Sequence, residues 1–152
     1  MKGYHYLPKR PQGTEQAITS FKRIFPKIRG KVIRITGTFS NKNWYRVKFF
    51  TIDGEVYVFK GFSWWYGGSG PQALAACLRR LCISEDVIQK LTDYSKDLHG
   101  DKYNPNSFFI NLKPLEANDC GTCHGMRFID LWQGLTKETI NCPTCNKFRE
   151  VI

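Results

Sequence analysis

Residues 31–62 read KVIRITGTFSNKNWYRVKFFTIDGEVYVFKGF and contain three successive strand signals. Three runs within this stretch, Lys31–Phe39, Trp44–Ile52 and Glu55–Phe62, are rich in the β-branched and aromatic residues that favour strands. Asp53-Gly54 separates the second run from the third, and this dipeptide is a strong hairpin signal. The stretch therefore predicts an antiparallel β-meander.

The two faces of the meander differ in chemistry. Strict alternation in the second run places its basic residues on one face and the apolar Val47 and Phe49 on the other. Sheets that bind nucleic acid combine cationic side chains, which contact phosphates, with aromatic rings on which bases stack. In the alternative interpretation the aromatic residues pack in the core and the basic ones only face water. The meander residues that we expect to bind are Arg34, Lys42, Trp44, Arg46, Lys48 and Tyr57.

A helix is expected before the meander. Apolar residues at helical spacing between Ala17 and Phe25 predict it, and Thr14 is its expected N-cap. Pro26 should end it, because the residue before a proline avoids helical geometry.

Further elements are expected after the meander. Pro71 suits the first turn of a helix that continues through Leu81, and Ser84 is the expected cap of another short helix. Residues 107–112, SFFINL, have the composition of a strand.

An aromatic and glycine-rich stretch connects the meander to the first of these helices. Trp64, Trp65 and Tyr66 are followed by Gly67-Gly68-Ser-Gly-Pro71. Three consecutive large aromatic side chains cannot all point into the core, so we add these three to the candidate binding surface. The alternative is a sharp strand-to-helix turn with one tryptophan buried beneath it.

Four cysteines form a metal-binding pattern in the last part of the chain. Cys120-Gly-Thr-Cys123 and Cys142-Pro-Thr-Cys145 are C-x-x-C pairs separated by the 18 residues from 124 to 141. This spacing is typical of a structural zinc site, and the residues between the pairs have the pattern of a hairpin. We therefore expect one Zn²⁺, bound by all four thiolates and structural because no coordination position stays open.

The segment from Cys120 to Cys145 resembles a zinc ribbon, and Cys142-Pro-Thr-Cys-Asn resembles that family's second cysteine turn. Cys120-Gly-Thr-Cys-His-Gly125 is also similar to one repeat of the cysteine-rich region in DnaJ-type co-chaperones. That repeat continues with a further glycine where this chain has Arg127, so the resemblance extends to the metal ligands and not to chaperone activity. Zinc ribbons act in nucleic-acid binding, in protein contacts or in stability alone.

Charge is distributed unevenly along the 152 residues. The net charge is +10; residues 1–60 contain 13 Lys and Arg against three acidic residues, whereas residues 61–152 contain ten of each. Such asymmetry indicates a polyanionic partner, either nucleic acid (DNA or RNA) or an acidic protein surface. No apolar run has the length of a membrane span and the N-terminus lacks the apolar core of a signal peptide, so we expect a cytoplasmic protein without a membrane partner.

Together these patterns predict an α+β protein: a small antiparallel β-meander with two or three short helices, followed by a C-terminal zinc ribbon. The expected division is a basic domain over 1–113 and a four-cysteine zinc module over 114–152. No nucleophile motif is present, so we expect no enzymatic activity. The expected function is that of a small basic accessory protein that binds nucleic acid or a nucleoprotein complex through its basic and aromatic β-surface. The alternative is an adaptor or inhibitor that docks the same face on an acidic protein partner.

Overall fold

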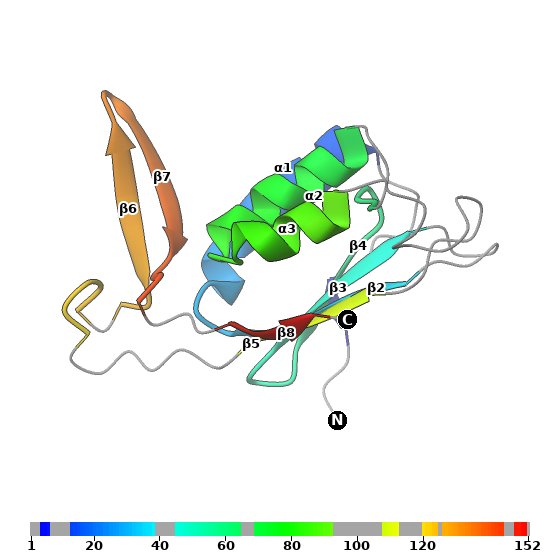
Figure 1. The fold of residues 1–152 in the computed structure, drawn as a ribbon, viewed down its shortest axis with the longest axis horizontal. Coiled ribbons are helices and arrows are strands. Elements are labelled where there is room, and N and C mark those ends of the chain that lie inside the picture. The colour runs from blue at the N-terminus through cyan, green and yellow to red at the C-terminus, as the bar shows by residue number, and fades with distance from the viewer. Residues whose placement is uncertain are drawn as a thin grey trace.

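The computed structural model describes residues 4–6, 13–38, 45–64, 69–92, 108–112, 120–124, 126–144 and 148–151. These residues form an α+β fold with a six-stranded sheet, three helices packed on one face of that sheet, and a separate two-stranded hairpin (Figure 1). The predicted fold class is confirmed. The helices are α1 (Thr14–Ile28), α2 (Ser69–Arg80) and α3 (Glu85–Thr92).

The large sheet is built around the predicted meander. Its strands, in spatial order, are β1 (Tyr4–Tyr6), β4 (Val56–Phe59), β3 (Arg46–Thr51), β2 (Val32–Thr38), β5 (Phe108–Leu112) and β8 (Phe148–Val151). All neighbours are antiparallel except β1, which pairs parallel to β4, so the sheet is mixed rather than purely antiparallel. The segment from Cys120 to Cys145, called the metal segment below, is followed by β8. Because β8 pairs with β5, residues that follow the metal segment complete the main sheet.

The inner face of the sheet is the core. Val47 and Phe49 on β3 are fully buried, as are Ile35 on β2 and Phe59 on β4, and all four pack in one cluster with the helices. The residues between them along β3 point to the opposite face and are half-buried. The predicted alternation is therefore confirmed, and within the described part of the chain no helix covers the outer face of the sheet (Figure 1).

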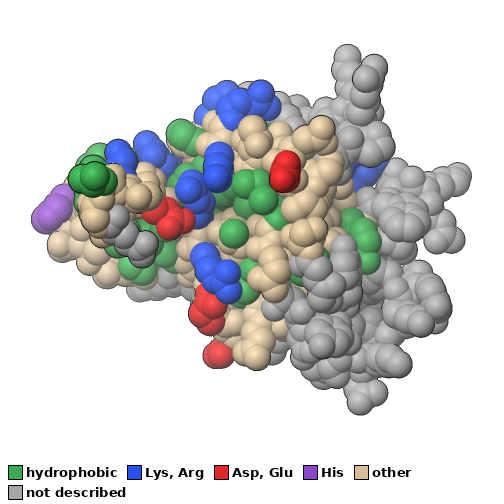
Figure 2. All heavy atoms as spheres, turned by 90° about the horizontal axis from the view of Figure 1, so that it is seen from above, with side chains coloured by type: hydrophobic (Ala, Val, Ile, Leu, Met, Phe, Trp, Pro, Cys, Tyr) green, Lys and Arg blue, Asp and Glu red, His purple; other side chains and the backbone are tan. Residues whose placement is uncertain are grey.

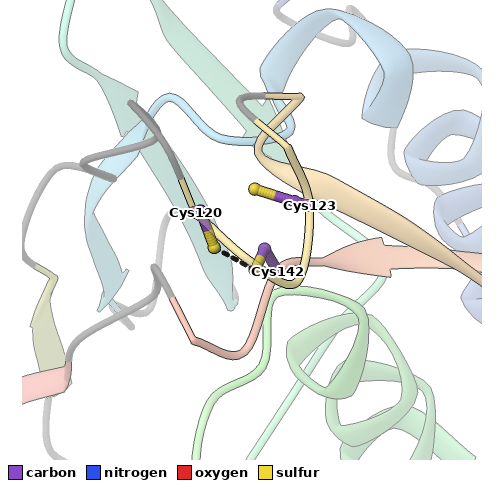
Figure 3. A group of neighbouring side chains, drawn as sticks. All are labelled: Cys120, Cys123 and Cys142. Carbon is purple, nitrogen blue, oxygen red and sulfur yellow. Dashed lines mark hydrogen bonds between the residues drawn. The ribbon is translucent and has the colours of Figure 1, made fainter.

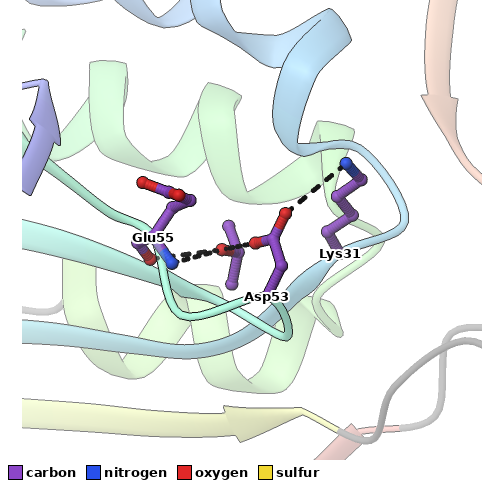
Figure 4. A network of polar contacts seen from close by, with 4 residues as sticks. Lys31, Asp53 and Glu55 are labelled. Carbon is purple, nitrogen blue, oxygen red and sulfur yellow. Dashed lines mark hydrogen bonds and ion pairs between the residues drawn. The ribbon is translucent and has the colours of Figure 1, made fainter. Parts of the chain in front are cut away.

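The β3–β4 turn is fixed by its own polar groups (Figure 4). Thr51 is buried, and its hydroxyl donates a hydrogen bond to the Asp53 carboxylate while accepting one of 3.0 Å from the Glu55 N–H. Gly54 adopts a φ of 86°, which glycine reaches without strain. Lys31 lies 3.7 Å from Asp53 in a half-exposed ion pair that stabilises little. The Asp53-Gly54 hairpin is thus confirmed.

Helix α1 begins one residue earlier than predicted. Gly13, not Thr14, is the N-cap: its carbonyl accepts the first helical bond from the Ala17 N–H at 3.0 Å. The Gln16 side chain accepts a 2.7 Å hydrogen bond from the Gly13 N–H and so satisfies a donor at the helix start. The Thr14 hydroxyl is instead directed to the Gly61 carbonyl, 3.5 Å away.

The prediction that Pro26 ends α1 is wrong, because the helix continues to Ile28. Proline lacks an N–H and leaves one helical bond unmade. The chain nevertheless gains the burial of Ile28, which has no exposed surface, and the Arg29 N–H closes the last turn on the Phe25 carbonyl at 2.9 Å. Tertiary packing therefore outweighs the local preference.

A chain of aromatic contacts closes one end of the core. Trp64 is fully buried and packs edge-on against Tyr45 and Phe108, with ring centroids 4.8 and 4.9 Å away. The Phe108 ring lies directly over Gly37 of β2, so that a Cβ built at Gly37 would overlap ring atoms. Glycine at position 37 is therefore required for the close approach of β5 side chains to β2.

We expect Gly37→Ala to lower the free energy of unfolding by about 1–3 kcal/mol, the usual cost of overpacking a core. Urea unfolding of the purified protein measures this. Gly121→Ala is the matched control, because a Cβ at Gly121 meets nothing within 4 Å. Equal stability of the two variants would contradict the role assigned to Gly37.

Candidate metal centre

Three of the four predicted metal ligands lie together (Figure 3). The sulfur atoms of Cys120, Cys123 and Cys142 are all within 4.8 Å of one another, and the sulfurs of Cys120 and Cys142 are 3.8 Å apart. Cys123 and Cys142 are buried and Cys120 is half-buried. Cys145, the fourth predicted ligand, lies outside the described residues. This cluster is close enough to bind one metal ion.

A hydrogen-bonded backbone turn positions the sulfur atoms of Cys120 and Cys123 close together. After the first pair, the His124 N–H donates to the Cys120 carbonyl at 2.8 Å and the Met126 N–H donates to the Cys123 carbonyl at 3.0 Å. His124 and Arg127 have positive φ values of 54° and 72°, which reverse the chain direction sharply. The His124 side chain is exposed.

The two cysteine turns contact each other as a pair. Thr122 and Thr144 occupy the third position of their C-x-x-C segments, and their hydroxyl oxygens are 2.8 Å apart. The Cys142 N–H donates to the Arg127 carbonyl at 3.0 Å, so the second turn is also hydrogen-bonded to the segment that follows the first. Hydrogen bonds therefore join the two cysteine turns, which are distant in sequence, at one site.

A hairpin lies between the two turns. Strands β6 (Phe128–Gln133) and β7 (Thr136–Asn141) pair antiparallel, with Gly134 and Leu135 as the turn residues. Gly134 has a φ of 62°, which explains why glycine stands there. Ile129 packs against the cysteine cluster and forms its apolar cover.

Asn141 joins the metal segment to the main body. Its side-chain carbonyl accepts a buried 3.1 Å hydrogen bond from the Gly30 N–H, just after α1, and its backbone carbonyl accepts one of 2.9 Å from the Cys82 thiol, just after α2. Only 2% of Asn141 is exposed. Because Asn141 precedes Cys142, the position of a metal ligand is tied directly to both helix ends.

Two further contacts support this junction. The Arg29 guanidinium lies over the Phe128 ring, 3.7 Å from its centroid, which is a cation–π geometry. Arg80 at the end of α2 forms a 3.4 Å ion pair with Glu138 on β7. The hairpin is therefore attached at its base by polar and aromatic contacts rather than by an apolar core.

The remaining two cysteines behave as thiols. Burial raises the pKa of Cys77 to about 12, and this residue lies in the main core as expected. Burial, with a smaller contribution from the neighbouring Cys142, raises the pKa of Cys82 to about 11. Both thiols are consequently protonated at neutral pH, which suits the role of Cys82 as a hydrogen-bond donor.

Three of the four basic residues predicted to bind a partner, Arg34, Arg46 and Lys48, share the outer face of the sheet. Arg34 is exposed and its guanidinium is oriented by a 3.1 Å hydrogen bond to the Asn111 side chain on β5. Arg46 and Lys48 are half-buried on β3, opposite Thr38 and Thr36 of β2. The structure therefore brings these three residues onto one surface.

The predicted aromatic residues do not join them. Tyr57 and Trp64 are 4% and 0% exposed and belong to the main core, because both lie on the side of the sheet that the helices cover. Neither offers a ring face for stacking. Lys42, Trp44, Trp65 and Tyr66 lie outside the described residues. Phe50, half-buried and opposite Arg34, is a described aromatic residue that does lie beside the basic ones.

We expect Asn141→Ala to lower the free energy of unfolding by about 1–3 kcal/mol, because it leaves the Gly30 N–H buried without its acceptor. Urea unfolding measures the loss, and metal content should stay at the wild-type value. Thr139→Ala is the control within the same hairpin, since it removes only the exposed 2.7 Å bond to Asp130. A loss no larger than that of the control would refute the role of Asn141.

Comparison of the chain with protein-family models, with curated proteins and with solved structures gave no match. Among the described residues, no helix combines the length and the apolar character needed to cross a membrane. The function has to be argued from the chain's own residues.

Proposed function

We propose that this chain is a small zinc-containing accessory protein that binds nucleic acid through the outer face of its sheet, with the zinc ion in a purely structural role. The observation that supports it most directly is the placement of Arg34, Arg46 and Lys48 on one helix-free surface. Each basic side chain on such a surface can neutralise a phosphate.

Neighbouring positions on that surface favour a polyanion. The outward residues of β2 and β3 are Arg34, Thr36, Thr38, Arg46, Lys48 and Phe50, a set without a carboxylate. The threonine hydroxyls can hydrogen-bond to phosphate or sugar, and the Phe50 ring can stack on a base. The net charge of +10 adds long-range attraction for the same class of ligand.

The helix side of the molecule is a less suitable surface. Figure 2 shows that Lys and Arg side chains there are spread out and interspersed with Asp and Glu. Arg79 is paired with Glu85 at 3.1 Å, and Arg80 is paired with Glu138. Mixed charges of this kind are typical of a solvated face.

Zinc is the metal that best suits the cysteine cluster. Two thiolates bound tetrahedrally at about 2.3 Å from one zinc ion lie about 3.8 Å apart, and the sulfurs of Cys120 and Cys142 are separated by that distance. An all-sulfur donor set also favours zinc over calcium or magnesium, which prefer oxygen. With Cys145 as the fourth ligand, the site would be closed, and the paired turns flanking a hairpin would form a zinc ribbon.

A non-enzymatic role in the cytoplasm is part of the proposal. A closed four-thiolate site holds its metal without an open position for a substrate. Thiolate ligands also require a reducing compartment, in which cysteines stay free to bind metal.

Arg46→Ala with Lys48→Ala should weaken binding to oligonucleotides and flatten its salt dependence. The slope of log K against log salt is negative, and loss of two phosphate contacts should reduce its magnitude by about 1.4 for single strands and about 1.8 for duplexes. Fluorescence anisotropy of labelled single- and double-stranded DNA and RNA, titrated at several salt concentrations, measures both effects.

Lys22→Ala with Lys27→Ala is the matched control, because it removes the same charge from exposed positions on α1. It should change affinity and slope much less than the β3 variant. Equal effects of the two double variants would show that binding depends only on net charge. Absence of binding to any oligonucleotide at low salt would refute the proposal. An acidic protein would then be the partner to test for the same face.

Cys142→Ser should abolish stoichiometric zinc binding and unfold the hairpin, because metal binding supplies much of the folding energy of such modules. Metal analysis of purified protein and the loss of protection of β6 and β7 amides in hydrogen exchange report the two effects. Cys82→Ser is the control: it is the same substitution at a neighbouring thiol that donates to Asn141, and it should keep one zinc per chain. Full zinc content in Cys142→Ser would contradict the assignment.

A further inference from the structure

The exposed apolar surface of the protein is concentrated in the hairpin. Five large hydrophobic side chains are exposed among the described residues, and four of them, Met126, Leu131, Trp132 and Leu135, belong to residues 126–135. Trp132 is 66% exposed and Leu135 is entirely exposed. In Figure 2 hydrophobic side chains are visible at this end of the molecule, at the left of the view. Clusters of this kind on a protruding element mark an interaction surface.

Strand β6 also has an open edge. Of the strands that the structure describes, only β7 pairs with β6. The β7 side faces the main body, where α2 and β7 are in contact and Arg80 pairs with Glu138, whereas β6 lies on the side away from the helices (Figure 1). An open edge offers backbone N–H and C=O groups to another strand.

Features that normally protect such an edge are weak here. The sequence of β6, FIDLWQ, contains no proline, lysine or glycine. Its one charged residue, Asp130, accepts a 2.7 Å hydrogen bond from Thr139 on β7 and is thereby directed toward its own partner strand. A six-residue strand, in which Phe128, Ile129 and Trp132 have high strand propensity, is thus available for pairing.

The charge of the hairpin indicates which partner suits this edge. Residues 126–144 contain two basic residues, Arg127 and Lys137, and two acidic ones, Asp130 and Glu138, so their net charge is zero. The net charge of +10 lies entirely in residues 1–60. A neutral, apolar edge has no electrostatic preference for nucleic acid or an acidic protein, and it does not repel a second copy of itself.

We propose that β6 is a self-association edge, through which two copies of this chain form a closed, two-fold symmetric dimer with a continuous four-stranded sheet β7-β6-β6-β7. An antiparallel pair of identical strands is compatible with two-fold symmetry, in which the same patch of each copy meets itself. The dimer goes beyond the proposed nucleic-acid function and does not depend on it.

The sequence of β6 selects one register. With the two-fold axis at Leu131, the two Leu131 side chains face each other, and Asp130 faces Trp132 of the second copy. In each copy the Lys137 ammonium lies 5.9 Å from the centroid of the Trp132 ring. Asp130 of one copy therefore lines up on one face with Trp132 and Lys137 of the other. With the axis at Asp130, two carboxylates would be opposite each other, which is unfavourable. The Leu131 register is therefore preferred to the Asp130 register.

Edge pairing of six-residue strands forms a small interface, below about 1,200 Å² in total, so a weak and reversible dimer is expected. Sedimentation velocity of the zinc-loaded full chain over micromolar to millimolar concentrations should show a monomer–dimer equilibrium. Leu131→Lys places like charges on the two-fold axis and should weaken the dimer by at least about tenfold. Leu131→Glu alone should do the same.

Mixing the Leu131→Lys and Leu131→Glu chains should restore the dimer that each variant alone weakens, because opposite charges then meet at the axis. This rescue also shows that both variants keep a folded hairpin, and metal content provides a second check of folding. Ile52→Lys is the matched control: it introduces the same charge at a 54% exposed apolar residue in the β3–β4 turn, and its dimer should be unchanged.

A chain that stays monomeric up to its solubility limit would overturn the proposal. So would a dimer that Leu131→Lys leaves intact, or an average mass that rises past that of two chains. The dimer should persist in high salt, where nucleic-acid binding is lost, so failure of the dimer and failure of the nucleic-acid proposal are separate results.

Discussion

The alternation of basic and apolar side chains along β3 determines which face of the sheet the helices cover. Because successive side chains of a strand point to opposite faces, Val47 and Phe49 must be covered while Arg46 and Lys48 must not. The three helices that the structure describes therefore lie on the Val47 face, and none of them covers the opposite face. The same alternation that requires a core thus creates the basic surface. A shift of one residue in register would bury two cations and expose two large apolar side chains.

The metal segment obeys a different constraint. A hairpin of two six-residue strands has too little apolar surface to fold alone, and its base is fixed from two sides. On one side Ile129 covers the cysteine cluster, and on the other Asn141 is hydrogen-bonded to the ends of α1 and α2. Asn141 and Cys142 are adjacent, so displacement of the ligand would also strain the junction. Metal binding at the cysteine cluster would therefore be coupled, through one peptide unit, to the attachment of the hairpin to the body.

Local patterns predict local features of this chain well. The meander, the Asp53-Gly54 turn, both helices after Pro71 and the convergence of three cysteines all follow from periodicity and spacing. Features set by tertiary contacts are not predictable in this way. Ile28 is buried in spite of Pro26, and Trp64 is buried because Phe108, 44 residues away in sequence, packs on it. Asn141 looks like an ordinary strand end in the sequence; only the fold brings Gly30 and Cys82 to it.

The two proposed surfaces are compatible because they are separated in space and in chemistry. The basic face belongs to β2 and β3, whereas the open edge belongs to β6, which stands beside the helices on the other side of the sheet. Dimerisation through β6 would therefore leave both basic faces accessible. A dimer of this kind would hold the two proposed nucleic-acid sites at a fixed separation, so the second contact would become intramolecular and the overall affinity for a long strand would rise without any new contact. The neutral hairpin would then set the spacing of the two basic faces, and the cations of each sheet would attract the polyanion.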